Sequence, residues 1–295
     1  MPLRTLALAL VALLLSATHL HAQERPLRIY IAVDIEGTSG VGTSQMIGGT
    51  GKDYGSARRF ATEEVNAVVG AILQRGPAEF LVNDAHGDMQ NLLHADLHPA
   101  IVYQQGSQKP FGMMQGLDST FDAAIFLGFH ARSGTPGAFL AHTSSGMTIQ
   151  NVWIDGTEVG EGELGARIAA YMGVPVILAS GDSAFVAQFA ATSRAELVST
   201  KTAASQGAAR TLHPKVVQER LAAAATRGVA RIATLRQTPA RGPVTLRVRF
   251  GMPGNAEALT AIPGMQQVDG QTVEMRFDSM LAAYRLYNLM YRYHP

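Results

Sequence analysis

Cysteine is absent from the 295-residue sequence, so the chain has no disulfide and no thiolate ligand. Zinc sites built on cysteine are therefore excluded. Any metal must be held by histidine, aspartate or glutamate. The absence of cysteine is also compatible with an oxidising compartment.

An excess of charge of either sign is missing as well. Lys and Arg together number 24, and Asp and Glu number 23. The leader described below holds one arginine and no acid, so the rest of the chain is formally neutral. This balance gives no basis for expecting nucleic acid or an anionic membrane surface as a partner.

Long hydrophobic runs are missing after the first residues of the chain. Residues 6–15 are apolar, follow Arg4 and precede small residues that end at Ala22. This run is shorter than the roughly 20 residues of a membrane span, and the pattern predicts a signal peptide at residues 1–22. We expect cleavage and a periplasmic or secreted protein with no membrane attachment. An uncleaved anchor is the alternative.

Apolar runs and helical spacing alternate through the next part of the chain. Strands are predicted at residues 27–33, 79–82, 101–103, 123–127, 147–153 and 174–179, and helices at residues 56–74 and 160–172. Such alternation predicts an α/β fold whose sheet is mainly parallel and carries helices on both faces.

The pattern changes after Ser183. Alanine-rich helices are predicted at residues 185–191 and 215–235, half-exposed strands at residues 244–250 and 272–277, and a closing helix at residues 279–293. We therefore expect three parts: the signal peptide at residues 1–22, a metal-binding α/β catalytic domain at residues 23–183, and a smaller α+β domain at residues 184–295.

Acidic and histidine side chains follow the predicted strands. Asp34 and Glu36 come directly after the first strand, His86 follows the second, and His130 follows the strand at residues 123–127. The carboxyl ends of parallel strands share one edge of a sheet, and ligands bind there. Carboxylate and imidazole suit zinc, with manganese or cobalt as alternatives. A solvated strand end or surface histidines would explain each residue singly, but their convergence favours a metal site.

Three further polar residues have two interpretations each. His142 lies in a loop of small residues, while Glu161 and Glu163 open the predicted helix at residues 160–172. An acidic residue at a helix N-terminus is favourable without any metal, and a loop histidine is often merely exposed. The residues alone leave both interpretations open.

Several motifs occur in one order with regular spacing. They are VDIEGTSG (33–40), TEEVN (62–66), VNDAHG (82–87), KPFGMMQGLDSTFDAAIFLGFHARSGTPG (109–137), LAHTSS (140–145), VGEGELGARIAAYMGVPV (159–176) and SGD (180–182). This ordered set resembles the D-aminopeptidase family of dipeptide-operon origin, peptidase family M55. The resemblance covers nearly all of the chain after the leader.

The resemblance implies a centre of two zinc ions per subunit. Asp34 would bridge both ions, Glu36 would bind the first, and the second would be bound by His86, His130 and Glu161. His142 would be the catalytic histidine. An ungapped count from Val159 to the Val-Pro pair at residues 174–175 selects Glu161, although Glu163 competes for the same role. We further expect Asn83 and Asp84 to orient His86, and Asp182 to cap the helix after Ser183.

The function implied is zinc-dependent removal of the N-terminal residue of short peptides. D-amino-acid peptides such as those containing D-Ala are the expected substrates, with L-peptides as the alternative. The family also implies a homo-oligomeric ring, such as a decamer. Two other classes stay open: a non-catalytic periplasmic metal- or peptide-binding protein, and a phosphoesterase, for which Arg132 is the only nearby cation.

Overall fold

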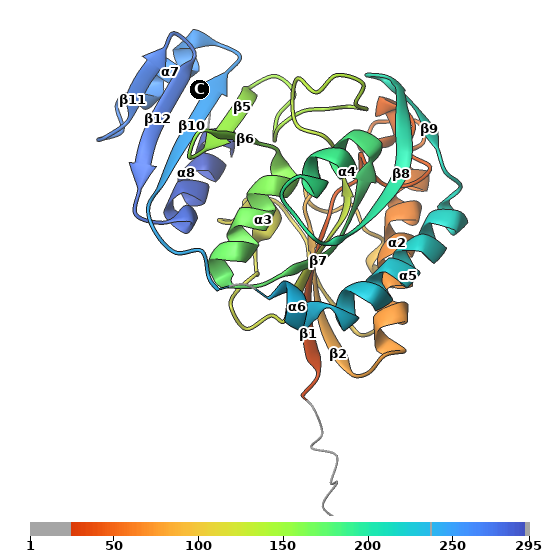
Figure 1. Cartoon of the computed structure of the whole chain (residues 1–295). Coiled ribbons are helices and arrows are strands. Elements are labelled where there is room, and N and C mark those ends of the chain that lie inside the picture. The colour runs from red at the N-terminus through yellow and green to blue at the C-terminus, as the bar shows by residue number, and fades with distance from the viewer. Residues whose placement is uncertain (1–24, 237, 293–295) are drawn as a thin grey trace, which may run out of the picture.

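The computed structural model describes residues 25–236 and 238–292, so the predicted signal peptide lies outside the described residues. A seven-stranded sheet has the order β3–β2–β1–β4–β7–β8–β9 (Figure 1). Its strands are β1 (Leu27–Val33), β2 (Ala78–Asp84), β3 (Ile101–Gln104), β4 (Ala123–Phe129), β7 (Val176–Asp182), β8 (Glu196–Ser205) and β9 (Ala208–Thr211). Every neighbouring pair is parallel except β8 with β9, which confirms the predicted α/β fold.

Helices cover both faces of this sheet because its central strands are apolar on both sides. On one face, Ile29 and Ile31 of β1 share a core with α2 (Tyr54–Leu73) and α5 (Pro214–Ala230). On the other face, Tyr30 and Ala32 share a core with α3 (Glu161–Met172) and α4 (Ser183–Ala190). Shorter elements complete the connections: η1 (Ser44–Met46), η2 (His94–Asp96), η3 (Gly112–Met114) and α6 (Ile232–Leu235).

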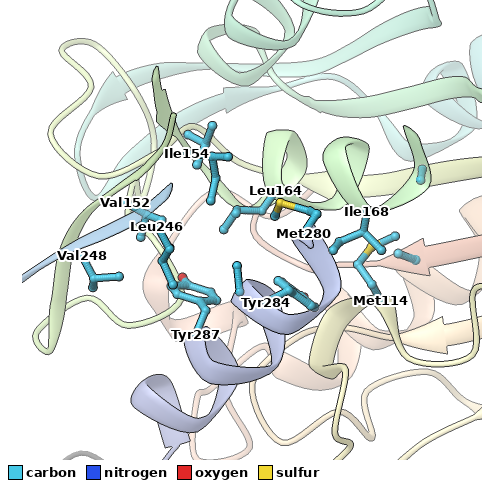
Figure 2. Packing of buried hydrophobic residues seen from close by; sticks show 14 of the residues in the cluster. Met114, Val152, Ile154, Leu164, Ile168, Leu246, Val248, Met280, Tyr284 and Tyr287 are labelled. Carbon is cyan, nitrogen blue, oxygen red and sulfur yellow. The ribbon is translucent and has the colours of Figure 1, made fainter. Parts of the chain in front are cut away.

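A second sheet of five antiparallel strands lies beside the first (Figure 1). Its order is β11 (Gln266–Asp269), β12 (Thr272–Phe277), β10 (Val244–Phe250), β5 (Ile149–Ile154) and β6 (Thr157–Val159), and it is accompanied by α7 (Pro253–Leu259) and α8 (Met280–Arg292). Leu246 and Val248 of this sheet pack towards Tyr284 and Tyr287 of α8, which also lies near Leu164 of α3 (Figure 2). One apolar core thus joins both sheets.

The two sheets divide the chain differently from the expected boundary at Ser183. β8, β9 and α5 lie beyond that residue but belong to the large sheet, whereas β5 and β6 precede it but pair into the small one. The sequence pattern of β5 identified a strand, but its partner β10 is remote in the chain, and such a pairing leaves no local signal. The division into two domains stays a prediction.

The strands β8 and β9 were not anticipated. β8 has the sequence ELVSTKTAAS, whose polar and small residues do not form the apolar run or alternation by which a strand is predicted. Among residues 25–236 and 238–292, no helix combines the length and hydropathy that a membrane span requires.

Candidate metal centre

Six polar side chains meet at the carboxyl edge of the large sheet. Asp34 and Glu36 follow β1, His86 follows β2, His130 follows β4, and Glu161 begins α3. The closest atom pairs are His86 Nδ1–Asp34 Oδ1 at 3.0 Å, His86 Nδ1–Glu36 Oε2 at 2.9 Å, His130 Nε2–Asp34 Oδ2 at 3.5 Å, His130 Nε2–Glu161 Oε2 at 3.5 Å, His142 Nε2–Glu36 Oε1 at 3.9 Å and His142 Nε2–Glu161 Oε1 at 3.8 Å. The structure therefore brings all six predicted residues together.

Two glycines allow the loop after β1 to lie against the end of β4. A Cβ atom at Gly37 would lie 1.8 Å from the carbonyl oxygen of Phe129, and one at Gly128 would lie 2.1 Å from the carbonyl oxygen of Asp34. Gly128 also has a φ of +73°, which L side chains rarely adopt. The Gly37 amide donates to the Gly128 carbonyl at 2.7 Å. This close approach places Asp34 within reach of His130.

Each histidine of the cluster has one ring nitrogen against a backbone carbonyl. The distances are 2.6 Å from His86 Nε2 to Ile47 O, 3.0 Å from His130 Nδ1 to Ala131 O, and 2.8 Å from His142 Nδ1 to Leu140 O. Because a carbonyl only accepts, we assign the N–H to that nitrogen in each ring. The other nitrogen is then the one that faces the carboxylates, and in the neutral ring it carries the lone pair with which metal-binding histidines hold the metal.

The neighbouring acids Glu161 and Glu163 point in different directions. Glu161 Oε1 accepts a hydrogen bond from the Ser144 amide at 2.5 Å, and its carboxylate faces His130 and His142. Glu163 instead accepts from the Gly160 amide at 3.0 Å and so caps the start of α3. The side chain of Glu161, and not that of Glu163, thus belongs to the cluster.

The ligand atoms form two groups that share Asp34. One consists of Asp34, Glu36 and His86 and the other of Asp34, His130 and Glu161, with the atoms of each group within 4.8 Å of one another. His86 is thus grouped with Glu36, whereas the family resemblance had placed it with His130 and Glu161. A third group contains Glu36, His130 and His142 and overlaps both.

Unpaired polar atoms show that the residues present fit a cation. Asp34 Oδ2 and His130 Nε2 are buried and have no hydrogen-bond partner, and Glu36 Oε2 is buried with only a close contact to His86 Nδ1 that is not a well-formed hydrogen bond. Buried polar groups normally find partners, and unpaired buried charge is costly. Oxygen and imidazole nitrogen are ligands for zinc, and these three atoms come from both groups around Asp34.

The charges of the cluster depend on one another. Burial, followed by the charge of Glu36, raises the pKa of Asp34 to about 7. Burial opposes ionisation of Glu36, but His86 and His130 hold its pKa well below the ordinary value. Burial likewise disfavours charge on both histidines, yet the facing carboxylates raise their pKa well above the ordinary value. The raised pKa values of Asp34 and of both histidines show that the buried negative charge favours a positive charge beside it. Protons can supply that charge, and divalent cations can take their place.

A cavity of about 170 Å³ opens onto this cluster. His142 has 23% of its side chain exposed, while Asp34 and Glu36 are almost fully buried at the cavity floor. The cavity is also lined by Leu164, Met89, Met113 and four residues of α8: Tyr284, Tyr287, Asn288 and Tyr291. The sequence predicted this helix but not its place at the cavity. The spacing of its polar-tipped residues, three or four apart on one face, was the only available signal.

The neighbours of the cluster act differently from the sequence expectation. Asn83 does not contact His86, and Asp84 reaches it only indirectly, because Asp84 binds Asn91 and Asn91 donates to the His86 carbonyl at 2.7 Å. Their effect is therefore on the backbone and not on the imidazole. Asp182 accepts from the first turn of α4, which confirms its predicted capping role.

Comparison with known proteins agrees with this geometry. The sequence profile of peptidase family M55, described as D-aminopeptidase, matches residues 27–289. The chain belongs to this family. It is 34% identical over 270 residues to the D-aminopeptidase of Bacillus subtilis (strain 168), which covers 88% of this chain and 94% of that protein. Membership of the D-aminopeptidase family identifies this chain as an enzyme, as the motif resemblance had predicted.

A solved structure shares the fold as well. The Zn-dependent D-aminopeptidase DppA from Bacillus subtilis, a self-compartmentalizing protease, superposes with a TM-score of 0.85 at 30% sequence identity. The match covers 90% of this chain and 96% of that one. The shared region includes both sheets, so the D-aminopeptidase fold extends through the small sheet and α8.

Proposed function

We propose that this protein is a zinc-dependent aminopeptidase that removes the N-terminal residue of short D-amino-acid peptides. Its membership of the D-aminopeptidase family supports the reaction, and the zinc dependence of the matched solved structure supports the metal. The observation that carries the proposal is the pair of ligand groups sharing Asp34. A phosphoesterase is disfavoured, because Arg132 is held near Glu158 outside the cavity.

We propose that two zinc ions bind, one to each ligand group. Asp34 would contribute an oxygen to both ions, with Glu36 and His86 completing one set and His130 and Glu161 the other. When bound, such a pair polarises a peptide carbonyl and lowers the pKa of a water molecule. The backbone contacts of His86 and His130 hold their ligand nitrogens in place before any metal arrives.

His142 is suited to proton transfer or to stabilising the developing oxyanion. Its ring stacks on that of His130 with centroids 4.0 Å apart, and its Nδ1–H is held by a backbone carbonyl. Nε2 faces both Glu36 and Glu161 at the open side of the cluster, where a scissile bond would lie. A base that exchanges a proton at this atom assists hydrolysis without binding metal itself.

The metal cluster also explains why a free amino terminus is selected. Asp34, Glu36 and Glu161 would each hold zinc, so the free amine of a short peptide would bind at the cluster as an uncharged ligand of one ion. An internal segment of a longer chain has no free amine to place there. The site therefore favours cleavage at the amino-terminal end.

A chiral pair of substrates tests this function. Release of p-nitroaniline from D-Ala and L-Ala p-nitroanilides is measured with and without exhaustive chelation. We expect preferential turnover of the D-substrate and its loss on chelation, with recovery when zinc is restored. Preference for the L-substrate would overturn the stereochemical part, and activity in thoroughly metal-free protein would overturn the metal mechanism.

We propose that the enzyme is exported and self-associates. The composition of residues 1–22 supports export, and the self-compartmentalizing character of the matched solved structure supports assembly. Amino-terminal sequencing of exported protein should begin at Gln23. Light scattering of that protein should give a mass several times that of one chain. A membrane-retained chain or a monomer would contradict the respective expectation.

A further inference from the structure

Arg292 ends α8 with an incompletely paired guanidinium group. Its Nη2 contacts the sulfur of Met89 at 3.4 Å, while its Nε is buried and has no hydrogen-bond partner. No ion pair joins Arg292 to any carboxylate of residues 25–236 and 238–292. A buried donor on a charged group that lacks an acceptor is costly, so the guanidinium group as a whole is suited to a further anionic partner.

Arg292 lies next to residues that line the cavity. Met89, which it contacts, lines the cavity, and so do Asn288 and Tyr291 on the same helix. Residues four apart on a helix are neighbours, so Arg292 lies one turn beyond Asn288 on the cavity side. An anion held here would be at the end of α8, away from Tyr284.

A second cation strengthens the positive character of this end. Lys109 is buried, and its Nζ donates to Asn83 Oδ1 at 2.7 Å and to the Asp84 carbonyl at 2.6 Å. Burial lowers the pKa of Lys109 to about 8, Asp84 opposes this, and the charge of Arg292 adds to it. Both oxygens bound by Lys109 are uncharged, and the nearby Asp84 carboxylate is hydrogen-bonded to Asn91 and Tyr103 rather than to Lys109.

The metal cluster thus lies on one side of the cavity, and two cationic side chains lie near the end of α8. A substrate peptide has groups for both places, because its amine would bind at the cluster and its carboxylate would meet a cation. Tyr287 is hydrogen-bonded to Ser144, whose amide donates to Glu161, so Tyr287 lies at the end of α8 nearer the metal cluster. Arg292 lies five residues further along α8, a rise of about 7.5 Å, and so at the end further from the cluster.

We propose that Arg292 binds the C-terminal carboxylate of the substrate, so that this enzyme prefers short peptides with a free carboxylate to the corresponding amides. This inference rests on the proposed aminopeptidase function. Arg292 takes no part in bond cleavage, and its guanidinium fixes the far end of the peptide through charge-assisted hydrogen bonds. The amide of the same dipeptide lacks the charge and would bind less tightly.

Steady-state kinetics on a matched substrate pair test this role. D-Ala-D-Ala and its C-terminal amide are compared in the zinc-loaded wild type, Arg292→Gln, Arg292→Lys and the control Arg285→Gln, which alters an exposed arginine of the same helix. In wild type, kcat/KM for the acid should exceed that for the amide about 10- to 100-fold, the effect of a hydrogen bond to a charged group.

Arg292→Gln should remove this preference through an increased KM for the acid, leaving the amide within about twofold. Arg292→Lys should retain part of the preference, and Arg285→Gln all of it. An equal loss for both substrates in Arg292→Gln would show a purely structural role, and equal kcat/KM values in wild type would show that no carboxylate site exists. Either result overturns the proposal.

Binding separates this proposal from the aminopeptidase function itself. The affinity of both peptides is measured calorimetrically with zinc-loaded His142→Ala, alone and combined with Arg292→Gln. The acid should bind more tightly than the amide only where Arg292 is present. If wild type cleaves neither peptide, the proposed function fails while this comparison still decides the carboxylate site. Equal affinities of acid and amide would refute it.

Discussion

The two walls of the cavity are built in different ways. The floor consists of acids and histidines at the ends of β1, β2 and β4 and at the start of α3, held by backbone contacts. The other wall consists of tyrosines, an asparagine and apolar side chains, largely from α8, which packs with the second sheet. The floor supplies the chemistry, whereas the α8 wall shapes the space for a substrate.

Removal of zinc should have the largest effect and should act on the floor alone. After exhaustive chelation, kcat/KM should fall by at least about 10³-fold, because Lewis-acid stabilisation contributes several kcal/mol. Circular dichroism should remain that of the folded protein, since both cores are formed by apolar residues. Unfolding on metal removal would show that the two walls are not independent.

Replacement of His142, which faces the open side of the cluster, should separate catalysis from metal binding. His142→Ala should lower kcat by about 10²- to 10⁴-fold, the range of general acid–base catalysis. Zinc content, measured by mass spectrometry, should remain that of wild type. A kcat close to the wild-type value would remove His142 from the mechanism, and loss of zinc would make it a ligand.

The neighbouring glutamates provide a matched pair at the start of α3. Glu161→Gln should lose one zinc ion per chain with most of the activity, because Glu161 faces His130. Glu163→Gln should keep both ions and lose less than about 1 kcal/mol of stability, because glutamine still accepts the hydrogen bond from Gly160 and only the charge at the helix N-terminus is lost. Zinc analysis and urea unfolding distinguish them, and the reverse pattern would contradict the grouping around Asp34.

A buried acid beneath the floor predicts a dependence of stability on pH. Burial raises the pKa of Glu64 to about 7 from 4.5, although hydrogen bonds from Ser39 oppose the rise. Between these values the folded state binds more protons than the unfolded state, so the free energy of unfolding falls as pH rises from 4.5 to 7. Glu64→Gln should flatten this dependence by up to a few kcal/mol.

Urea unfolding of wild type and Glu64→Gln at pH 5 and pH 7.5 measures the difference. Other groups that titrate in this range, including Asp34, are common to both proteins and cancel. Identical pH profiles would show that Glu64 has no raised pKa in the folded chain.

Removal of one hydroxyl from the α8 wall should have the smallest effect. Tyr287→Phe loses the hydrogen bond to Ser144, which should cost about 1 kcal/mol of stability. Zinc content should not change, because Tyr287 touches no ligand directly. A loss of zinc comparable to that of Glu161→Gln would show that α8 also holds the metal centre.

The fold of the floor was largely predictable from the sequence. The strand-end positions of Asp34, Glu36, His86 and His130 followed from apolar runs and from the geometry of parallel sheets. Glu161 needed the family resemblance, because an acid at a helix start has an ordinary explanation. The structure distinguishes it from Glu163 by the direction of each side chain.

The α8 wall was not predictable in the same way. Its tyrosines have the spacing of any buried helical face, and their exposure to a cavity depends on how α8 packs between α3 and the second sheet. That sheet itself pairs β5 with β10 across a long stretch of chain, which no local pattern specifies. The shape of the cavity therefore depends on long-range packing, whereas the metal ligands can be identified from the local sequence at the strand ends.

Zinc content per chain tests the central claim most directly. Inductively coupled plasma mass spectrometry of the purified enzyme should give two zinc ions per chain, and Asp34→Ala should retain neither at full occupancy, because both ligand groups contain Asp34. A single zinc in the wild type, or one fully occupied zinc in Asp34→Ala, would contradict a centre of two ions joined by Asp34.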